Sequence, residues 1–152
     1  IGMKRESRRI VGDLVLTEND IVNRVKYPDA SFTTTWTMDL HYATPKQVKY
    51  FKGWEWMTYC TNGKEVWIRP YHVPYRCLYA KDIANLFIGG RCMSVTHQAL
   101  GTVRVQATLG MAGEVIGMAA SLCAKHGVLP RDVYRTYLND LKKLMRAGAP
   151  LR

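Results

Sequence analysis

The chain has 152 residues, of which 47% are hydrophobic and 22% are charged. This composition is that of a globular protein and excludes intrinsic disorder as the main state of the chain. The formal net charge of +10, taken alone, favours an anionic partner such as a nucleic acid or a membrane surface.

The first part of the chain predicts an extended segment, a short helix and a strand. Residues 8–16 are rich in Ile, Val and Leu and favour an extended conformation. Thr17 has a side chain suited to a helix N-cap, and the acidic residues after it complement the positive end of a helix. Pro28 limits the length of this helix. Residues 31–42 are β-branched and aromatic and predict the next strand.

The dipeptide Asn62-Gly63 gives the clearest local prediction, a β-hairpin over residues 56–69. Both flanks are aromatic and β-branched, and Asn-Gly tolerates the positive φ angles of a type I′ turn. Two prolines follow closely, and neither can donate an N–H to a sheet ladder. Residues 71–78 are therefore expected to form a connecting segment.

The C-terminal half predicts a strand followed by two helices. Residues 85–89 form a short apolar run that ends in glycine and predict a buried strand. Residues 102–125 predict one long apolar helix, which Gly127 caps. Residues 130–147, beginning with a proline, predict a second and amphipathic helix. The predicted fold class is α+β: a β-hairpin region, then a strand and two C-terminal helices.

The long apolar helix also has a membrane interpretation. The segment 105–124 is long and apolar enough to cross a bilayer, and Glu114 is its only formal charge. Against a membrane span, Glu114 would lie near the midplane of the bilayer, and small residues dominate the run. Each glycine costs about 0.5–1 kcal/mol in a helix, which close packing against a sheet or a cofactor would offset. We therefore expect a helix inside a protein and no membrane partner.

A glycine pair lies between the predicted strand and the long helix. A helix N-terminus presents free N–H groups and partial positive charge, and glycines before it let a ligand approach the backbone. Folds of the α/β class bind anionic or electron-rich ligands in this way at the ends of strands. The segment from Gly89 to Gly101 is thus a candidate ligand site.

Two parts of the sequence resemble the FAD-dependent oxidoreductase family. The first part comprises Arg-Glu-Ser-Arg-Arg-Ile-Val-Gly at 5–12 and Leu-Thr-Glu-Asn-Asp at 16–20. The second comprises Pro-Tyr-Arg-Cys-Leu-Tyr at 74–79, Asn-Leu-Phe-Ile-Gly-Gly-Arg-Cys-Met-Ser at 85–94 and His-Gln-Ala-Leu-Gly-Thr-Val-Arg-Val at 97–105. Together they cover about half of the chain, in the order that the family has them.

The resemblance implies a C-terminal fragment of an enzyme that transfers a hydride between an organic substrate and FAD. Members bind FAD on a Rossmann-like domain built from both ends of the chain, with a β-rich substrate domain inserted between. The G-x-G-x-x-G motif that holds the FAD pyrophosphate is missing from this sequence. The fragment alone is therefore expected to be inactive, with an incomplete FAD site. The implied domains are 1–74 for the substrate domain, 75–127 for the FAD-binding domain and 128–152 for a C-terminal amphipathic helix.

The resemblance also implies the residues of the site. The ribityl and pyrophosphate portion of FAD would lie beside Gly89, Gly90 and Arg91. The N1–C2=O edge of the isoalloxazine, which is negative in reduced flavin, would face a helix N-terminus. The residues at that N-terminus are Thr102, Val103, Arg104 and Val105. The catalytic residues on the substrate side would be His97 and Arg104, and Arg76 would reach the substrate.

Alternatives stay open for several of these residues. His97 is otherwise a loop histidine bonded to backbone, and Arg76 otherwise pairs with a carboxylate. Cys92 is expected to be a buried and inert thiol, with a covalent flavin link as the alternative. The four cysteines have no metal-ligand spacing and are too few for a disulfide scaffold, so we expect reduced thiols and no metal site. No signal peptide is visible; the compartment stays open, with the cytoplasm preferred.

Two other classes of function compete with the flavoenzyme. A nucleic-acid-binding module would explain the charge, but the basic residues are spread along the chain without a binding motif. A carbohydrate-binding or polysaccharide-lyase-associated protein would explain the tryptophans, which a β-domain core explains as well. The expected partners are therefore a small-molecule substrate and the missing N-terminal half of the same protein. A second copy of the chain is the alternative partner that would cover the long helix. No nucleic-acid partner is expected.

Overall fold

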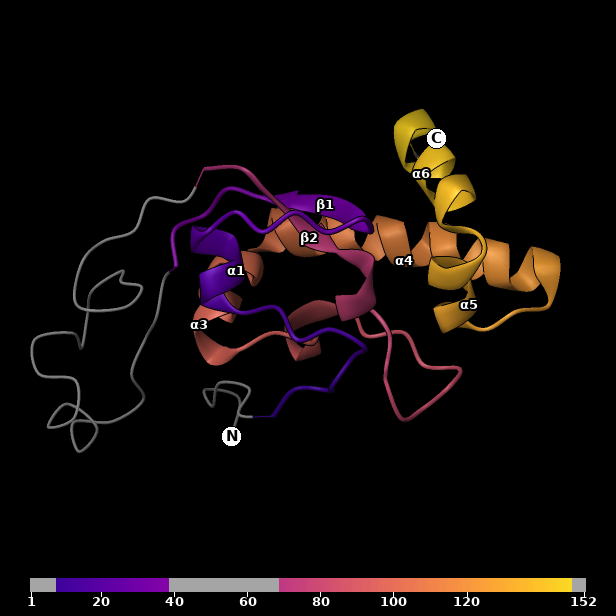
Figure 1. Ribbon diagram of the computed structural model, residues 1–152, viewed down its shortest axis with the longest axis horizontal. Helices are drawn as coiled ribbons and strands as arrows, with labels where there is room; N and C mark the ends of the chain where they lie inside the picture. The colour runs from indigo at the N-terminus through magenta and orange to yellow at the C-terminus, as the bar shows by residue number, and fades with distance from the viewer. Residues whose placement is uncertain (1–7, 39–68, 149–152) are drawn as a thin grey trace, which may run out of the picture.

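The computed structural model describes residues 8–38 and 69–148 of the chain (Figure 1). The elements in chain order are α1 (Glu18–Val22), β1 (Ala30–Thr34), β2 (Tyr71–Pro74), the 3₁₀ helices η1 (Tyr75–Cys77) and η2 (Gly90–Cys92), α3 (His97–Val103), α4 (Gln106–His126), α5 (Pro130–Arg135) and α6 (Leu138–Ala147). Within these ranges, five α-helices accompany a two-stranded antiparallel sheet, so the α+β class is confirmed. The hairpin predicted at 56–69 lies outside the described residues.

The helix predicted after Thr17 is present as α1. The Thr17 Oγ1 accepts a hydrogen bond from the Asp20 N–H at 3.2 Å, and the Asp20 carboxylate accepts one from the Thr17 N–H at 2.8 Å. This reciprocal pair is a capping box, which satisfies two backbone donors at the helix start. The helix has five residues, so the prediction of a short helix is confirmed.

The sheet joins strands that lie far apart in the sequence. β1 pairs with β2 in antiparallel register, Phe32 opposite Val73 and Thr34 opposite Tyr71. The prediction that residues 71–78 only connect was therefore wrong, because residues 71–74 form a strand. Its proline is the last residue of β2, so the interior rungs of the ladder are made by residues that have an N–H.

The strand predicted at residues 85–89 is reduced to a single bridge. Phe87 pairs with Tyr79, and the Ile88 N–H donates to the Leu78 oxygen at 2.7 Å. The prediction of a strand was wrong because a turn includes Asn85 at the start of this run and the glycine pair begins at its end, which leaves too few residues for a ladder. Ile88 is nevertheless buried, as the apolar run predicted.

The long helix predicted at 102–125 is two helices, α3 and α4. Thr96 caps α3, since its Oγ1 accepts the Ala99 N–H at 3.2 Å, so helix begins earlier than predicted. Val105 is extended, with φ −71° and ψ 147°, and interrupts the helix before α4. Near this break the Thr102 hydroxyl is hydrogen-bonded to Thr34 and Trp36, which ties the end of α3 to residues 34–36.

Two predicted ends of the C-terminal helices are confirmed, whereas the predicted number of helices is wrong. Gly127 caps α4 with a left-handed φ of 65°, and Pro130 is the first residue of α5. The single helix predicted over 130–147 is divided into α5 and α6 at residues 136–137. At this break Tyr137 stacks on His126, with ring centroids 4.3 Å apart.

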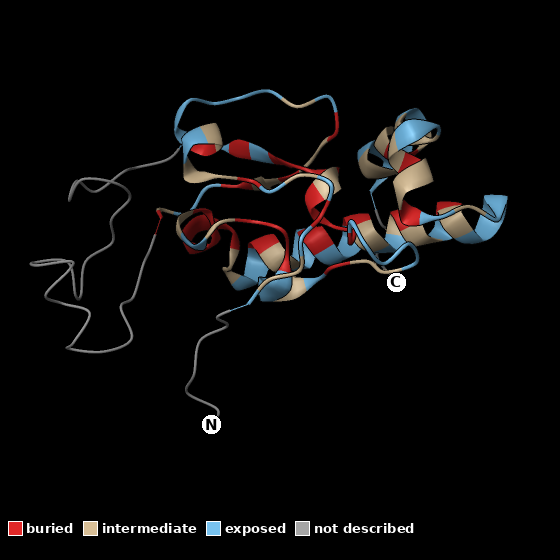
Figure 2. Ribbon diagram, turned by 60° about the horizontal axis from the view of Figure 1, so that its bottom comes forward, coloured by how far each residue is buried: buried red, intermediate tan, exposed pale blue. Residues whose placement is uncertain are grey.

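The core lies between the sheet and the helices α3 and α4, where buried residues face one another (Figure 2). β1 packs on α4, and α1 packs on α3. The C-terminal part of α4 carries α5 and α6 (Figure 1). The largest fully buried side chains include Tyr75, Tyr79, Leu16 and Met38.

α4 is an apolar helix that is only partly buried. Among the described residues it is long and apolar enough to cross a membrane, with a mean hydropathy of 1.4, and 28% of its most apolar window is buried. Its three glycines, Gly110, Gly113 and Gly117, are exposed, and a Cβ at each would meet no atom within 4 Å. Close packing against β1 therefore does not explain the glycines, since they lie on the other face of the helix.

Candidate functional site

The junction between α3 and α4 exposes the N-terminus of a long helix. The N-cap of α4 is Val105, whose side chain has no oxygen to accept the N–H groups of the first turn. Gln106 and Ala107 are exposed there. α4 has 21 residues, so its unpaired N–H groups and its dipole favour an electron-rich or anionic ligand at this end.

The glycine pair Gly89-Gly90 lies alongside α4. A Cβ at Gly89 would contact the Ile116 Cδ1 of α4 at 3.6 Å, and η2, which begins at Gly90, also contacts α4. Gly90 has a left-handed φ of 69°, and a Cβ there would meet nothing within 4 Å. Ile116 lies about 15 Å along the helix axis from the first residue of α4. The glycine pair therefore lies beside the middle of α4, about 15 Å of helix rise from the α4 N-terminus.

His97 and Arg104 lie at opposite ends of α3. His97 is the first residue of the helix, exposed, with its Nδ1 3.2 Å from the Arg9 Nη2. It is thus a helix residue with a side-chain partner and not a loop histidine. Arg104 is the half-buried C-cap, whose N–H donates to the Leu100 oxygen at 3.1 Å. Their spacing of seven residues places both on one face of α3, about 10 Å apart along its axis.

Thr102 and Val103 face the protein core. Both are 0% exposed, and the Thr102 hydroxyl lies 2.9 Å from the Thr34 Oγ1. Val105 and Arg104, by contrast, are only partly buried. Of the four residues expected at the helix N-terminus, these two therefore have atoms at the surface of the α3–α4 junction, while Thr102 and Val103 hold α3 in place.

Arg76 forms an ion pair with Asp29, a residue that the sequence analysis did not single out. The Arg76 Nε and Nη2 donate to the Asp29 carboxylate at 2.9 and 3.0 Å, and the Arg76 backbone N–H donates at 2.9 Å. These hydrogen bonds raise the pKa of Arg76 above its ordinary value. The guanidinium also lies 4.7 Å from the Tyr134 ring centre. The structure thus gives Arg76 the carboxylate partner that was the alternative to a ligand.

A second ion pair joins the two ends of the described chain. Arg131 of α5 donates to both oxygens of Asp13, at 2.6 and 2.7 Å, and to the Lys81 oxygen. The hydrogen bonds from Arg131 lower the pKa of Asp13 from its usual value. No spacing in the sequence indicates either carboxylate as a partner, because each ion pair spans dozens of residues.

The cysteines and the potential metal ligands of the described residues form no metal-binding cluster at this site. Cys92 of η2 is exposed, so the expectation of a buried thiol was wrong: η2 lies at the surface beside the glycine pair. Cys77 is buried, and desolvation raises its pKa. Across residues 8–38 and 69–148, no three His, Cys, Asp or Glu side chains gather as a metal site would require.

Comparison with protein-family models gives a match to the FAD dependent oxidoreductase family over residues 3–145. Neither the curated proteins nor the solved structures contain a match to the chain. The matched residues include the glycine pair, the α3–α4 junction and both partners of the buried ion pair. Since the match covers nearly the entire sequence, the chain belongs to the FAD dependent oxidoreductase family.

Proposed function

We propose that this chain forms one side of the FAD site in an oxidoreductase that transfers a hydride between an organic substrate and FAD. The observation that carries the proposal is the N-terminus of α4, a 21-residue helix whose N-cap is a valine. FAD supplies the hydride-accepting ring when bound. Reduced flavin carries negative charge at N1–C2=O, and a free helix N-terminus stabilises such charge.

The spacing of the glycine pair and the start of α4 supports an extended dinucleotide as the ligand. The glycine pair with Arg91 and the free end of α4 are separated by about 15 Å of helix rise, so one long ligand can contact both. In this arrangement Gly89, Gly90 and Arg91 contact the ribityl and pyrophosphate portion, and Val105 and the first N–H groups of α4 contact the ring. Thr102 and Val103 support the junction from the core side, since both are fully buried.

The exposed face of α4 is where a further segment of protein would pack. In the most apolar window of this helix 28% of the residues are buried, and three glycines are among its exposed residues. A Rossmann-like portion bearing the G-x-G-x-x-G motif, which this sequence lacks, would cover it and complete the cofactor site. The exposed glycines of α4 would then permit close approach of that portion. In this proposal residues 1–74 belong to the substrate domain, 75–127 to the FAD-binding domain and 128–152 to a C-terminal helical segment.

His97 and Arg104 are the polar side chains that we assign to the substrate side. They occupy one face of α3, next to the free end of α4. Arg104 is the nearer in sequence to that end, and in this proposal its guanidinium stabilises negative charge there. His97, as an imidazole on the same face, can donate a proton to substrate or hold its hydroxyl or carboxylate group.

Flavin content tests the cofactor assignment. Protein expressed from its complete reading frame is expected to show flavin absorption bands in stoichiometric amount, and this chain expressed alone is not. Gly90→Val should reduce the flavin content, because a β-branched residue at φ 69° is strained by about 1–2 kcal/mol and would distort the turn. Gly127→Val is the matched control: its φ of 65° imposes equal strain at the far end of α4. Equal loss of flavin in both variants, or no flavin in the complete protein, would contradict the proposal.

Arg104→Ala is expected to leave flavin bound and to lower its two-electron midpoint potential by about 20–30 mV, or roughly 1 kcal/mol. The cation near N1–C2=O favours the reduced and negatively charged form, while backbone N–H groups keep the cofactor in place. The measurement is a spectroscopic redox titration of the flavin, with Arg135→Ala, an exposed arginine of α5, as control. An unchanged potential in Arg104→Ala would remove this residue from the flavin edge.

A further inference from the structure

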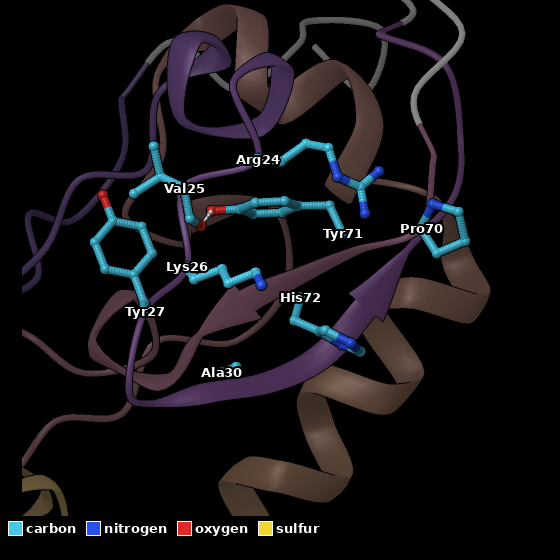
Figure 3. Close-up of a pocket in the computed structure, with 8 residues that line it drawn as sticks. All are labelled: Arg24, Val25, Lys26, Tyr27, Ala30, Pro70, Tyr71 and His72. Carbon is cyan, nitrogen blue, oxygen red and sulfur yellow. Dashed lines mark hydrogen bonds between the residues drawn. The ribbon is translucent and has the colours of Figure 1, made fainter.

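A cavity lies between the end of α1 and the start of β2, and it shares no residue with the proposed flavin surface (Figure 3). Its volume is about 250 Å³. The lining residues are Arg24, Val25, Lys26, Tyr27, Ala30, Pro70, Tyr71 and His72. The cavity therefore combines basic side chains with aromatic and aliphatic walls.

The charge of the lining is positive. Arg24 and Lys26 are cationic, and none of the eight lining residues is acidic. Among the ion pairs formed within the described ranges, none uses Arg24 or Lys26. In the view of Figure 3 the Lys26 amine ends between Tyr71 and His72, and the Arg24 side chain extends toward Pro70. A small anion in the cavity would therefore meet two cations.

The walls are held rigid by hydrogen bonds. The Tyr71 hydroxyl donates to the Val25 oxygen at 2.9 Å, which anchors the outer end of this side chain (Figure 3). The His72 Nδ1 lies 2.9 Å from the Thr33 Oγ1, and this contact holds the His72 ring. Tyr71 is only 5% exposed, so its ring forms part of the apolar wall, which the exposed Val25 and Pro70 complete.

Arg24 occupies a backbone position that normally belongs to glycine. Its φ is 56°, and among the described residues it is the one non-glycine residue with positive φ. The Val25 N–H donates to the Asp20 oxygen and the Arg24 N–H to the Ile21 oxygen, which is the Schellman pattern at the end of α1. Arginine is less stable than glycine in this backbone conformation. At this position its guanidinium reaches the cavity.

We propose that this cavity binds a small organic anion whose carboxylate contacts Arg24 and Lys26 and whose flat apolar body packs against the wall formed by Val25, Pro70 and Tyr71. Arginine is suited to the carboxylate because its fork of N–H donors matches the two oxygens. The volume lies just below the usual range of ligand pockets, about 300–1,000 Å³, and so suits a single ring and not a nucleotide. This site stands independently of the flavin proposal.

Benzoate is the probe, and benzyl alcohol is its neutral counterpart of similar shape. Calorimetric titration of the purified protein should show saturable binding of benzoate and much weaker binding of benzyl alcohol. Arg24→Gly should weaken benzoate binding at least about tenfold, because a hydrogen-bonded charge is lost. The same variant should melt at an equal or higher temperature, because glycine relieves the left-handed backbone. A fall in benzoate affinity without a fall in melting temperature distinguishes a ligand-binding role of Arg24 from a structural one.

Lys26→Gln provides a second test, with Lys81→Gln, an exposed lysine outside the cavity, as its matched control. Benzoate affinity should fall several-fold in the first variant and stay unchanged in the second. Absence of saturable binding, equal binding of benzyl alcohol, or an equal effect of the two lysine variants would overturn the proposal. Tighter binding of inorganic phosphate than of benzoate would also overturn it, since the ring would then contribute nothing.

Discussion

Asp29→Ala is expected to lower the free energy of unfolding by about 3–5 kcal/mol. Asp29 is 0% exposed and accepts three hydrogen bonds from Arg76, two from the guanidinium and one from the backbone N–H. Its removal leaves the Arg76 side chain, which is 20% exposed, without its anionic partner. The loss is measured by urea denaturation followed by circular dichroism.

Asp140→Ala is the matched control for this prediction. Its carboxylate pairs with Lys143, and the two side chains are 45% and 75% exposed. An exposed pair of this kind contributes at most about 0.5–1 kcal/mol, because water and salt screen it. If Asp29→Ala and Asp140→Ala destabilise the protein equally, the buried ion pair is not what holds this part of the fold.

Gly12→Ala is expected to lower the free energy of unfolding by about 2–3 kcal/mol, through overpacking. A Cβ at this position would lie 2.6 Å from the Arg76 oxygen and 2.9 Å from the Tyr79 oxygen. These are backbone atoms, and Gly12 is itself bridged to Ala80, so the contact cannot be relieved by rotating a side chain. Thermal and urea denaturation measure the loss.

Gly110→Ala is the control, since it makes the same chemical change on the exposed face of α4. A Cβ there meets no atom within 4 Å, and alanine favours a helix over glycine by about 0.5–1 kcal/mol. The two substitutions should therefore move stability in opposite directions. Equal stability of Gly12→Ala and the unsubstituted protein would show that the segment around Gly12 can move away from residues 76–79.

The sequence by itself determined the features that depend on neighbouring residues. Thr17 predicted the start of α1, Gly127 the end of α4 and Pro130 the start of α5, because a cap is a hydrogen bond or a φ angle within a few residues. The order of family-like segments also predicted the family, which the match over residues 3–145 confirms. The positions of the candidate flavin residues remain predictions that came from that resemblance.

The tertiary structure decided the features that depend on partners far away in the chain. The β1–β2 pairing turned residues 71–74 into a strand, since a ladder requires a partner that local propensity does not reveal. The hydrogen bonds of Thr102 tie the end of α3 to Thr34 and Trp36, and α4 begins only after Val105, where the sequence predicted one continuous helix. Asp29 became the partner of Arg76 for the same reason: a buried charge is stable only where the fold brings its counter-ion.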